Sequence, residues 1–180
     1  MFYLFLADGF EETEALAPLD ILRRCEIETI TVGVGSKEIT GAHGITVRAD
    51  IKDSELQMKN CKGIILPGGM PGTKNLAASK IVTDAVKQTA SAGGLLCAIC
   101  AAPSVLGELG LLCGRIATCF PGFEDKLPGA TIVNEPAVKS ENVITARGAG
   151  AALEFGFLIA EQIKGAEFVE KLRKNMQCAQ

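Results

Sequence analysis

Short, nearly uninterrupted apolar runs alternate along this chain with longer amphipathic segments, and this alternation constrains its fold more than any other feature. Residues 2–6, 63–66 and 95–99 are such runs, as expected of strands that are covered on both faces. Residues 28–34 are rich in β-branched side chains and supply a further strand. Strands that alternate with helical segments predict βαβ units and an α/β fold with a doubly wound, mostly parallel sheet sandwiched by helices.

The helical segments have recognisable ends. The first, residues 11–24, begins with acidic and ends with basic side chains, which suits the helix dipole. Ser79 is a plausible N-cap for a helix over residues 80–92. Further helices are predicted over residues 101–112, 151–164 and 166–176, further strands over residues 115–118, 131–133 and 142–145, and a small hairpin over residues 38–40 and 45–47.

Length and composition favour one globular domain over residues 1–180. Apolar residues make up 48% of the sequence and charged residues 22%, and no internal repeat or linker interrupts the pattern. The net charge is −3 and no basic cluster is present, so nucleic acid is not expected as a primary ligand. The apolar start, residues 1–7, is short and is followed by acids, so we expect neither export nor membrane insertion but a cytoplasmic protein.

The seven cysteines have irregular spacing, and their number is odd. In a chain without an export signal this favours reduced thiols over disulfides. The only histidine, His43, lies in a Gly-Ala-His-Gly stretch typical of a hairpin turn. Zinc sites usually need paired cysteines or further histidines. The sequence therefore predicts no metal site and no cofactor.

Three predicted strands are followed by distinctive residues. The segments are residues 8–14, with Asp-Gly-Phe-Glu-Glu-Thr-Glu, residues 67–69, with Pro-Gly-Gly, and residues 98–102, with Ala-Ile-Cys-Ala-Ala. Ligands of parallel α/β sheets bind beyond the carboxyl ends of the strands. These segments are therefore the candidate functional site.

Cys100 lies between a predicted strand and a predicted helix, with small residues on both sides. This resembles a nucleophile elbow, in which small neighbours permit a sharp turn that exposes the nucleophile. A helix N-terminus would favour the thiolate, which is the reactive form. The alternative role is that of a small buried apolar side chain. A dithiol centre with Cys97 is a weaker alternative, because Cys97 lies inside an apolar strand.

The other two segments offer backbone donors and acids. A backbone N–H of residues 67–69, together with that of Ala101, could bind an oxyanion, although a plain loop is the alternative. Glu11, Glu12 and Glu14 stand where acids interact favourably with a helix dipole. Any of them that points at Cys100 could instead act as an acid or base.

At these residues the chain resembles the DJ-one (ThiJ/PfpI) superfamily, which includes a parkinsonism-associated protein deglycase and its bacterial homologues. The resemblance covers nearly the whole chain and implies a flavodoxin-like fold related to class I glutamine amidotransferases. It implies that Cys100 is the nucleophile, Glu14 its carboxyl partner, and Gly69 and Ala101 the neighbouring backbone donors. Phe120 stands where several members have a histidine. The segments that carry the resemblance are residues 9–14, 66–69, 98–103, 125–126 and 146–150.

The resemblance also implies the classes of function to expect. Members are typically homodimers and are credited with glyoxalase III and deglycase activity, oxidation sensing through a cysteine sulfinate, and holdase chaperoning. We expect a cofactor-independent enzyme that acts on reactive aldehydes or glycated adducts through Cys100 thiolate and Glu14, and we expect no protease. The alternative is a sensor or holdase that uses Cys100 sulfinate without turnover. Biosynthesis of a thiazole precursor is a third possibility that rests on the name of the family alone, without support from any residue of this chain.

Overall fold

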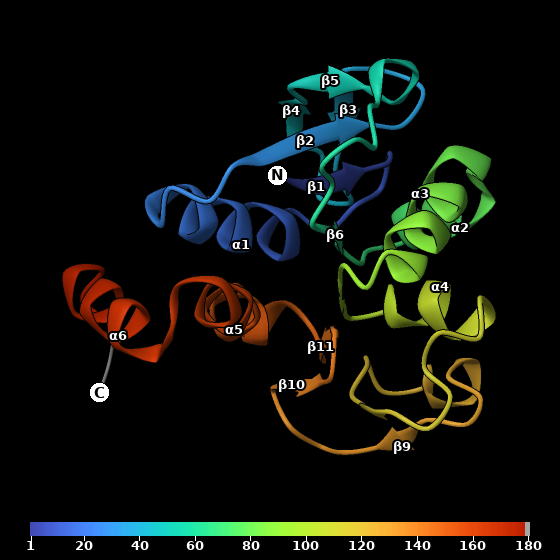
Figure 1. Ribbon diagram of the computed structural model, residues 1–180. Helices are drawn as coiled ribbons and strands as arrows, with labels where there is room; N and C mark the ends of the chain where they lie inside the picture. Colours follow the sequence, from blue (N-terminus) through green and yellow to red (C-terminus); the bar gives the residue numbers. More distant parts are fainter. Residues whose placement is uncertain (179–180) are drawn as a thin grey trace.

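The computed structural model describes residues 1–178 as a single α/β domain built on a seven-stranded sheet (Figure 1). The strand order is β10-β11-β7-β6-β1-β2-β5. Every neighbouring pair is parallel except β10 with β11, which is antiparallel. The mostly parallel sheet is therefore confirmed. The strands are β1 (Phe2–Leu6), β2 (Thr29–Gly33), β5 (Ile51–Lys52), β6 (Gly63–Leu66), β7 (Leu95–Ile99), β10 (Ala137–Ser140) and β11 (Val143–Ala146).

Two small sheets lie outside the main one. The predicted hairpin is confirmed: β3 (Glu38–Thr40) pairs antiparallel with β4 (Thr46–Arg48), and His43 lies in the turn between them. The second small sheet pairs β8 (Ile116–Ala117) with β9 (Thr131–Ile132) in parallel.

Helices cover both faces of the main sheet (Figure 1). Helices α1 and α5 pack together on one face, with α6 beside α5, and α2, α3 and α4 lie on the other. The predicted sandwich is therefore confirmed. The helices are α1 (Glu12–Arg24), α2 (Gly72–Ala78), α3 (Lys80–Ser91), α4 (Pro103–Glu108), α5 (Ala152–Lys164) and α6 (Ala166–Asn175).

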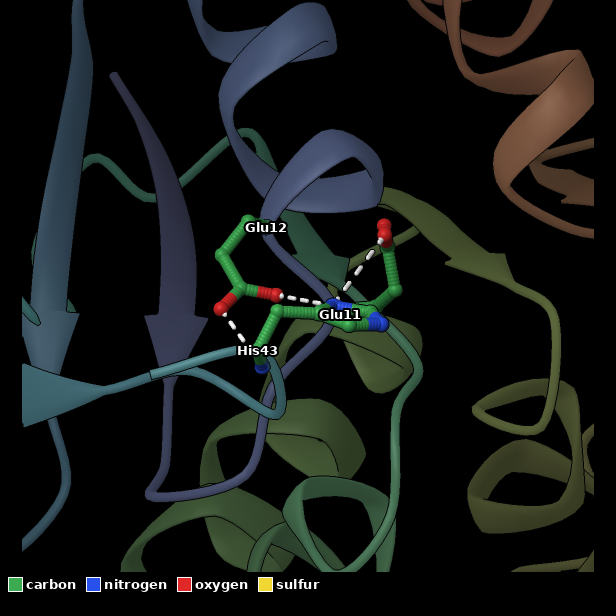
Figure 2. Close-up of side chains that lie close together, drawn as sticks. All are labelled: Glu11, Glu12 and His43. Atoms are coloured by element: carbon green, nitrogen blue, oxygen red, sulfur yellow. Dashed lines mark hydrogen bonds and ion pairs between the residues drawn. The ribbon is translucent and has the colours of Figure 1, made fainter. Parts of the chain in front are cut away.

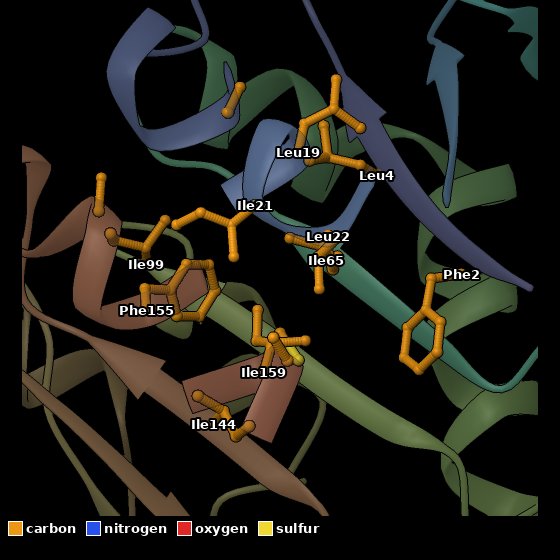
Figure 3. Close-up of a cluster of buried hydrophobic side chains, with 14 of the residues drawn as sticks. Phe2, Leu4, Leu19, Ile21, Leu22, Ile65, Ile99, Ile144, Phe155 and Ile159 are labelled. Atoms are coloured by element: carbon orange, nitrogen blue, oxygen red, sulfur yellow. The ribbon is translucent and has the colours of Figure 1, made fainter. Parts of the chain in front are cut away.

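The apolar strands form two hydrophobic cores, one on each face of the sheet. Leu4, Ile65 and Ile99 face the α1/α5 side, where they join Leu22 and Phe155 (Figure 3). All five are inaccessible to solvent. Burial of one such side chain stabilises the fold by about 1.5–3 kcal/mol.

Neighbouring residues of the same strands point to the opposite face. Phe5, Leu66 and Ala98 join Val86 of α3 and Leu106 of α4 in the second core. Successive side chains of a strand alternate between faces, so continuous apolar runs are needed where both faces are covered.

The predicted helix over residues 101–112 is wrong in length. Helix α4 begins at Pro103 and ends at Glu108. Gly110 then takes a positive φ of 73°, which the chain adopts in a turn and not within a helix. Helix α2 and strands β5 and β10 were not predicted.

Candidate active site

The three predicted segments meet at one edge of the sheet. Strands β6, β1 and β7 lie side by side, with β6 in the middle. Because all three are parallel, the loops that follow them emerge at the same edge. These loops bring Glu14 at the start of α1, the glycines after β6, and Cys100 after β7 into contact.

Cys100 is held in an unusual backbone conformation. Its φ is +65°, a left-handed value that few non-glycine residues adopt and that frequently marks functional sites. Its N–H donates to the carbonyl of Ala146 at 2.8 Å, and its carbonyl accepts from the N–H of Phe120 at 2.8 Å. These two hydrogen bonds fix the turn that leaves the side chain partly exposed, as predicted for a nucleophile elbow.

Glu14 is the acid that points at this cysteine. Its side chain is only 1% exposed, and its carboxyl lies close enough to the Cys100 thiol for each group to shift the pKa of the other. Its Oε2 accepts from the N–H of Gly68 at 3.0 Å, and the N–H of Ala149 lies near enough to the carboxyl to lower its pKa. Glu14 is therefore built into the fold by backbone donors from two separate loops.

Glu11 and Glu12 have other roles. The Oε2 of Glu11 accepts from the N–H of Glu14 at 2.6 Å, so Glu11 is the side-chain N-cap of α1. Glu12 bonds His43. Of the three acids left open by the sequence, the geometry therefore brings only Glu14 to the thiol.

Because Gly68 has no side chain, it leaves the space in which the side chains of Glu14 and Cys100 meet. A Cβ at this position would lie 2.5 Å from Glu14 Oε2 and 2.6 Å from Cys100 Cβ. Both distances are shorter than any stable contact between such atoms. The absence of a side chain at Gly68 is therefore a condition for the contact between Glu14 and Cys100.

Two backbone N–H groups complete the surroundings of the sulfur. Those of Gly69 and Ala101 lie near enough to the sulfur to lower the pKa of Cys100. Gly69 has a φ of +90°, and a Cβ there would lie 2.4 Å from the backbone nitrogen of Glu11, so only glycine fits. The structure thus brings all four residues predicted for the site together.

The pKa values of the pair are both shifted upward. Burial raises the pKa of Glu14 to about 7, and hydrogen bonding to Cys100 opposes this shift. Burial, followed by the charge of Glu14, raises the pKa of Cys100 to about 12, while the N–H groups of Ala101 and Gly69 oppose it. An ionised carboxylate next to the sulfur disfavours a second negative charge.

Ionisation of the thiol by a helix N-terminus stays a prediction, and burial and the neighbouring acid oppose it. Helix α4 has only six residues and begins at Pro103, beyond the turn. Its dipole is short, and it is outweighed by burial and by the neighbouring acid. Formation of the thiolate therefore needs a nearby group that accepts the proton of Cys100.

The pair can perform this activation itself. Since Glu14 titrates near pH 7, the pair holds one proton over a wide range above neutrality. The charge of Glu14 raises the pKa of the thiol only while Glu14 is ionised, so movement of the proton from sulfur to carboxylate also removes the repulsion. A carboxylate with this pKa, within hydrogen-bond reach of a thiol, has the properties of a general base.

A cavity of about 530 Å³ adjoins the loop that approaches Glu14, although neither Glu14 nor Cys100 lines it. The ring of Phe120 is 47% exposed, and its Cδ2 would be 3.4 Å from a Cβ at Gly148. The same loop supplies the N–H of Ala149 to Glu14. Sequence reasoning missed this loop as part of the site, although its Arg-Gly-Ala-Gly motif was a signal. The cavity is lined by Phe120, Pro121, Pro136 and residues 147–151.

Cys97 does not form a dithiol centre with Cys100 in this fold. Its side chain is 1% exposed within strand β7, and burial raises the pKa of its thiol. It belongs to the hydrophobic core on the α1/α5 side.

Comparison with known proteins identifies the family. The sequence model of the DJ-1/PfpI family matches residues 2–162. The chain belongs to the DJ-1/PfpI family. The flavodoxin-like fold predicted from the resemblance is confirmed by solved structures of this family. The computed structure is similar to oxidized DJ-1 of Toxoplasma gondii, with a TM-score of 0.95, 29% identity, and coverage of 99% of this chain and 98% of the other.

Two curated DJ-1/PfpI relatives are similar over nearly their whole length. Protein dj-1beta of Drosophila melanogaster is 32% identical, and the alignment covers 98% of this chain and 96% of the relative. The glutathione-independent glyoxalase DJR-1.2 of Caenorhabditis elegans is also 32% identical, with 91% of this chain and 88% of the relative covered. The name of the second relative records a glyoxalase within the family.

Proposed function

We propose that the protein is a cofactor-independent enzyme that converts reactive 2-oxoaldehydes, such as methylglyoxal, or their adducts on thiols and amines. The observation that carries this proposal is the approach of the buried Glu14 carboxyl to the partly exposed Cys100 thiol, with the N–H groups of Gly69 and Ala101 beside the sulfur. This arrangement supplies a nucleophile, a proton acceptor and donors for negative charge. The name of the nematode glyoxalase supports the choice of substrate class.

The first step is addition of sulfur to the aldehyde. Cys100 Sγ forms a bond to the aldehyde carbon while its proton passes to Glu14, and the carbonyl π electrons move to oxygen, which is then protonated. The N–H groups of Gly69 and Ala101 stabilise negative charge at the sulfur and at the adjoining oxygen. The product is a hemithioacetal on Cys100.

The second step is an internal redox exchange within the bound substrate. Glu14 removes the proton from the former aldehyde carbon and returns a proton to the neighbouring carbon, while the hydroxyl proton passes from the first oxygen to the second. The first carbon is thereby oxidised and the second is reduced. This gives a lactoyl thioester, which water hydrolyses to lactate and free Cys100 thiol. No external oxidant or reductant is needed.

Phe120 affects what the site can do. Where a histidine would offer a second base, this chain has an apolar ring at the edge of the cavity. All proton transfers are therefore assigned to Glu14. For the same reason we do not propose peptide hydrolysis, which must also protonate an amine leaving group.

A second candidate function is oxidation sensing or holdase chaperoning through Cys100. The sulfur is partly exposed, and two N–H groups and the Glu14 carboxyl surround it, which would stabilise a sulfinate formed by peroxide. The similarity to a structure of an oxidized DJ-1 favours this alternative.

We further propose a cytoplasmic homodimer. Within residues 1–178, no helix is both long and apolar enough to cross a membrane.

Lactate production from methylglyoxal tests the enzymatic proposal. The wild-type protein should produce lactate, while Cys100→Ser and Glu14→Ala should lose at least 100-fold in kcat/KM, the lower range for an acid–base residue. Cys113→Ser, which changes an exposed cysteine elsewhere, is the matched control and should retain full activity. Lactate production that is equal in wild type and Cys100→Ser would reject the proposal. Selective dioxidation of Cys100 without turnover would favour sensing.

A further inference from the structure

Glu11, Glu12 and His43 form a second cluster of ligand-type side chains, separate from the thiol. Figure 2 shows the two glutamates at the start of α1 and the imidazole reaching them from the β3–β4 hairpin. One donor atom from each residue lies within 4.8 Å of the others. His43 is 31 residues away from Glu12 in the sequence, so spacing alone did not predict this cluster.

Backbone N–H groups hold one oxygen of each carboxylate and leave the other oxygen without a backbone donor in the described part of the chain. Glu12 Oε1 accepts from the N–H of His43 at 2.8 Å and from that of Ile45 at 3.4 Å. Glu11 Oε2 accepts from the N–H of Glu14 at 2.6 Å. Such outer hydrogen bonds orient metal-binding carboxylates in known sites.

The remaining oxygens converge on a single imidazole nitrogen. His43 Nδ1 is 2.8 Å from Glu12 Oε2 and 4.0 Å from Glu11 Oε1. One N–H can satisfy only one of these oxygens well, and among residues 1–178 no donor hydrogen-bonds Glu11 Oε1. Two carboxylates, whose side chains are only 15% and 7% exposed, therefore face a donor that can neutralise one of them.

A divalent cation would satisfy both carboxylates. Ligand atoms of a tetrahedral zinc site, with bonds near 2.0–2.1 Å, lie about 3.3 Å apart. The separations of 2.8 and 4.0 Å from His43 Nδ1 bracket this value, and all three ligand atoms lie within 4.8 Å of one another. The His43 side chain is 67% exposed, which leaves room for water as a further ligand.

We propose that Glu11 Oε1, Glu12 Oε2 and His43 Nδ1 bind a divalent first-row transition metal such as Zn²⁺. Imidazole nitrogen is a ligand for this class, whereas Mg²⁺ and Ca²⁺ prefer oxygen alone. Binding replaces the hydrogen bond between His43 and Glu12 and releases the Nδ1 proton to solvent.

The alternative explanation is a simple ion pair between His43 and Glu12, and nuclear magnetic resonance separates the two. His43 is the only histidine, so ¹H–¹⁵N spectra of the imidazole report this site without interference from thiols that also bind zinc. Addition of Zn²⁺ should shift the His43 Nδ1 resonance saturably at about one equivalent, and EDTA should reverse the shift. Millimolar Mg²⁺ should not reproduce it.

Variants make the test decisive. Glu11→Gln retains an oxygen to cap α1 but removes the charged ligand, so it should weaken Zn²⁺ binding at least tenfold, the smallest loss seen even for outer-shell changes. Glu38→Gln, on the same hairpin and exposed, is the matched control and should bind as wild type. Absence of a His43 shift, an equal shift with Mg²⁺, or undiminished binding in Glu11→Gln would each overturn the proposal.

Discussion

The carboxyl of Glu14 lies beside the Cys100 thiol where the loops after β1, β6 and β7 meet, and each group shifts the pKa of the other. The residue type alone does not mark either of them as part of a functional site. Their contact creates a pair that titrates as a unit, and the properties of this pair lead to the predictions below.

Gly68→Ala should disrupt the site and destabilise the fold. The new methyl group would lie 2.5 Å from Glu14 Oε2 and 2.6 Å from Cys100 Cβ, and overpacking of this kind costs about 1–3 kcal/mol. Urea denaturation measures the loss, and the lactate assay should show reduced activity in the protein that remains folded. Gly150→Ala, whose Cβ would meet no atom within 4 Å, is the matched control. Its free energy of unfolding should lie within about 0.5 kcal/mol of the wild-type value. Equal stability of the two variants would contradict this prediction.

Glu14→Gln should change how stability depends on pH. The pKa of Glu14 rises from 4.5 to about 7 on folding, so the folded state keeps a proton that the unfolded state releases above pH 4.5. The corresponding stability is fully present below pH 4.5 and is lost as the pH rises through 7, a decrease of about 3 kcal/mol. Glutamine does not titrate, so the variant should lack this decrease. Urea unfolding at pH 4.5 and pH 8 in both proteins measures it, and parallel curves would contradict the raised pKa.

Mild peroxide should oxidise Cys100 before the buried cysteines. Cys97 is 1% exposed and Cys119 is 6% exposed, so peroxide in solution has little access to either sulfur. Both residues are therefore protected from oxidant, whereas Cys100 is partly exposed and adjoins a proton acceptor. Peptide mass spectrometry after graded peroxide treatment would show the order. Dioxidation of Cys97 or Cys119 ahead of Cys100 would contradict the site as described.

Most of the fold could be predicted from the sequence, because periodicity encodes it. The apolar runs at residues 2–6, 63–66 and 95–99 became β1, β6 and β7, and Ser79 caps α3 by accepting from the N–H of Val82 at 3.4 Å. Strand β10 was missed because its residues are half-buried and it pairs only at the edge of the sheet. Local pattern carries no signal for such pairing.

The residues of the site could be predicted from the sequence, but the shifts of their pKa values could not. The turn around Cys100 and the glycines after β6 are visible as motifs, whereas the choice of Glu14 came from family resemblance. The direction of the thiol pKa could not be predicted, because it depends on burial and on the separation of two side chains brought together from distant parts of the chain. The same reason explains why Glu12 and His43 were not linked.

The central claim is that Glu14 controls the reactivity of Cys100, and the rate of Cys100 alkylation as a function of pH tests it most directly. Iodoacetamide modification should be followed by mass spectrometry from pH 5 to 10, with EDTA present, in wild type and Glu14→Gln. The account predicts a rise in the wild-type rate through pH 7, as the pair loses its first proton, and loss of this step in the variant. The account would be contradicted by identical profiles, or by a single wild-type step near the ordinary thiol pKa of about 8.5.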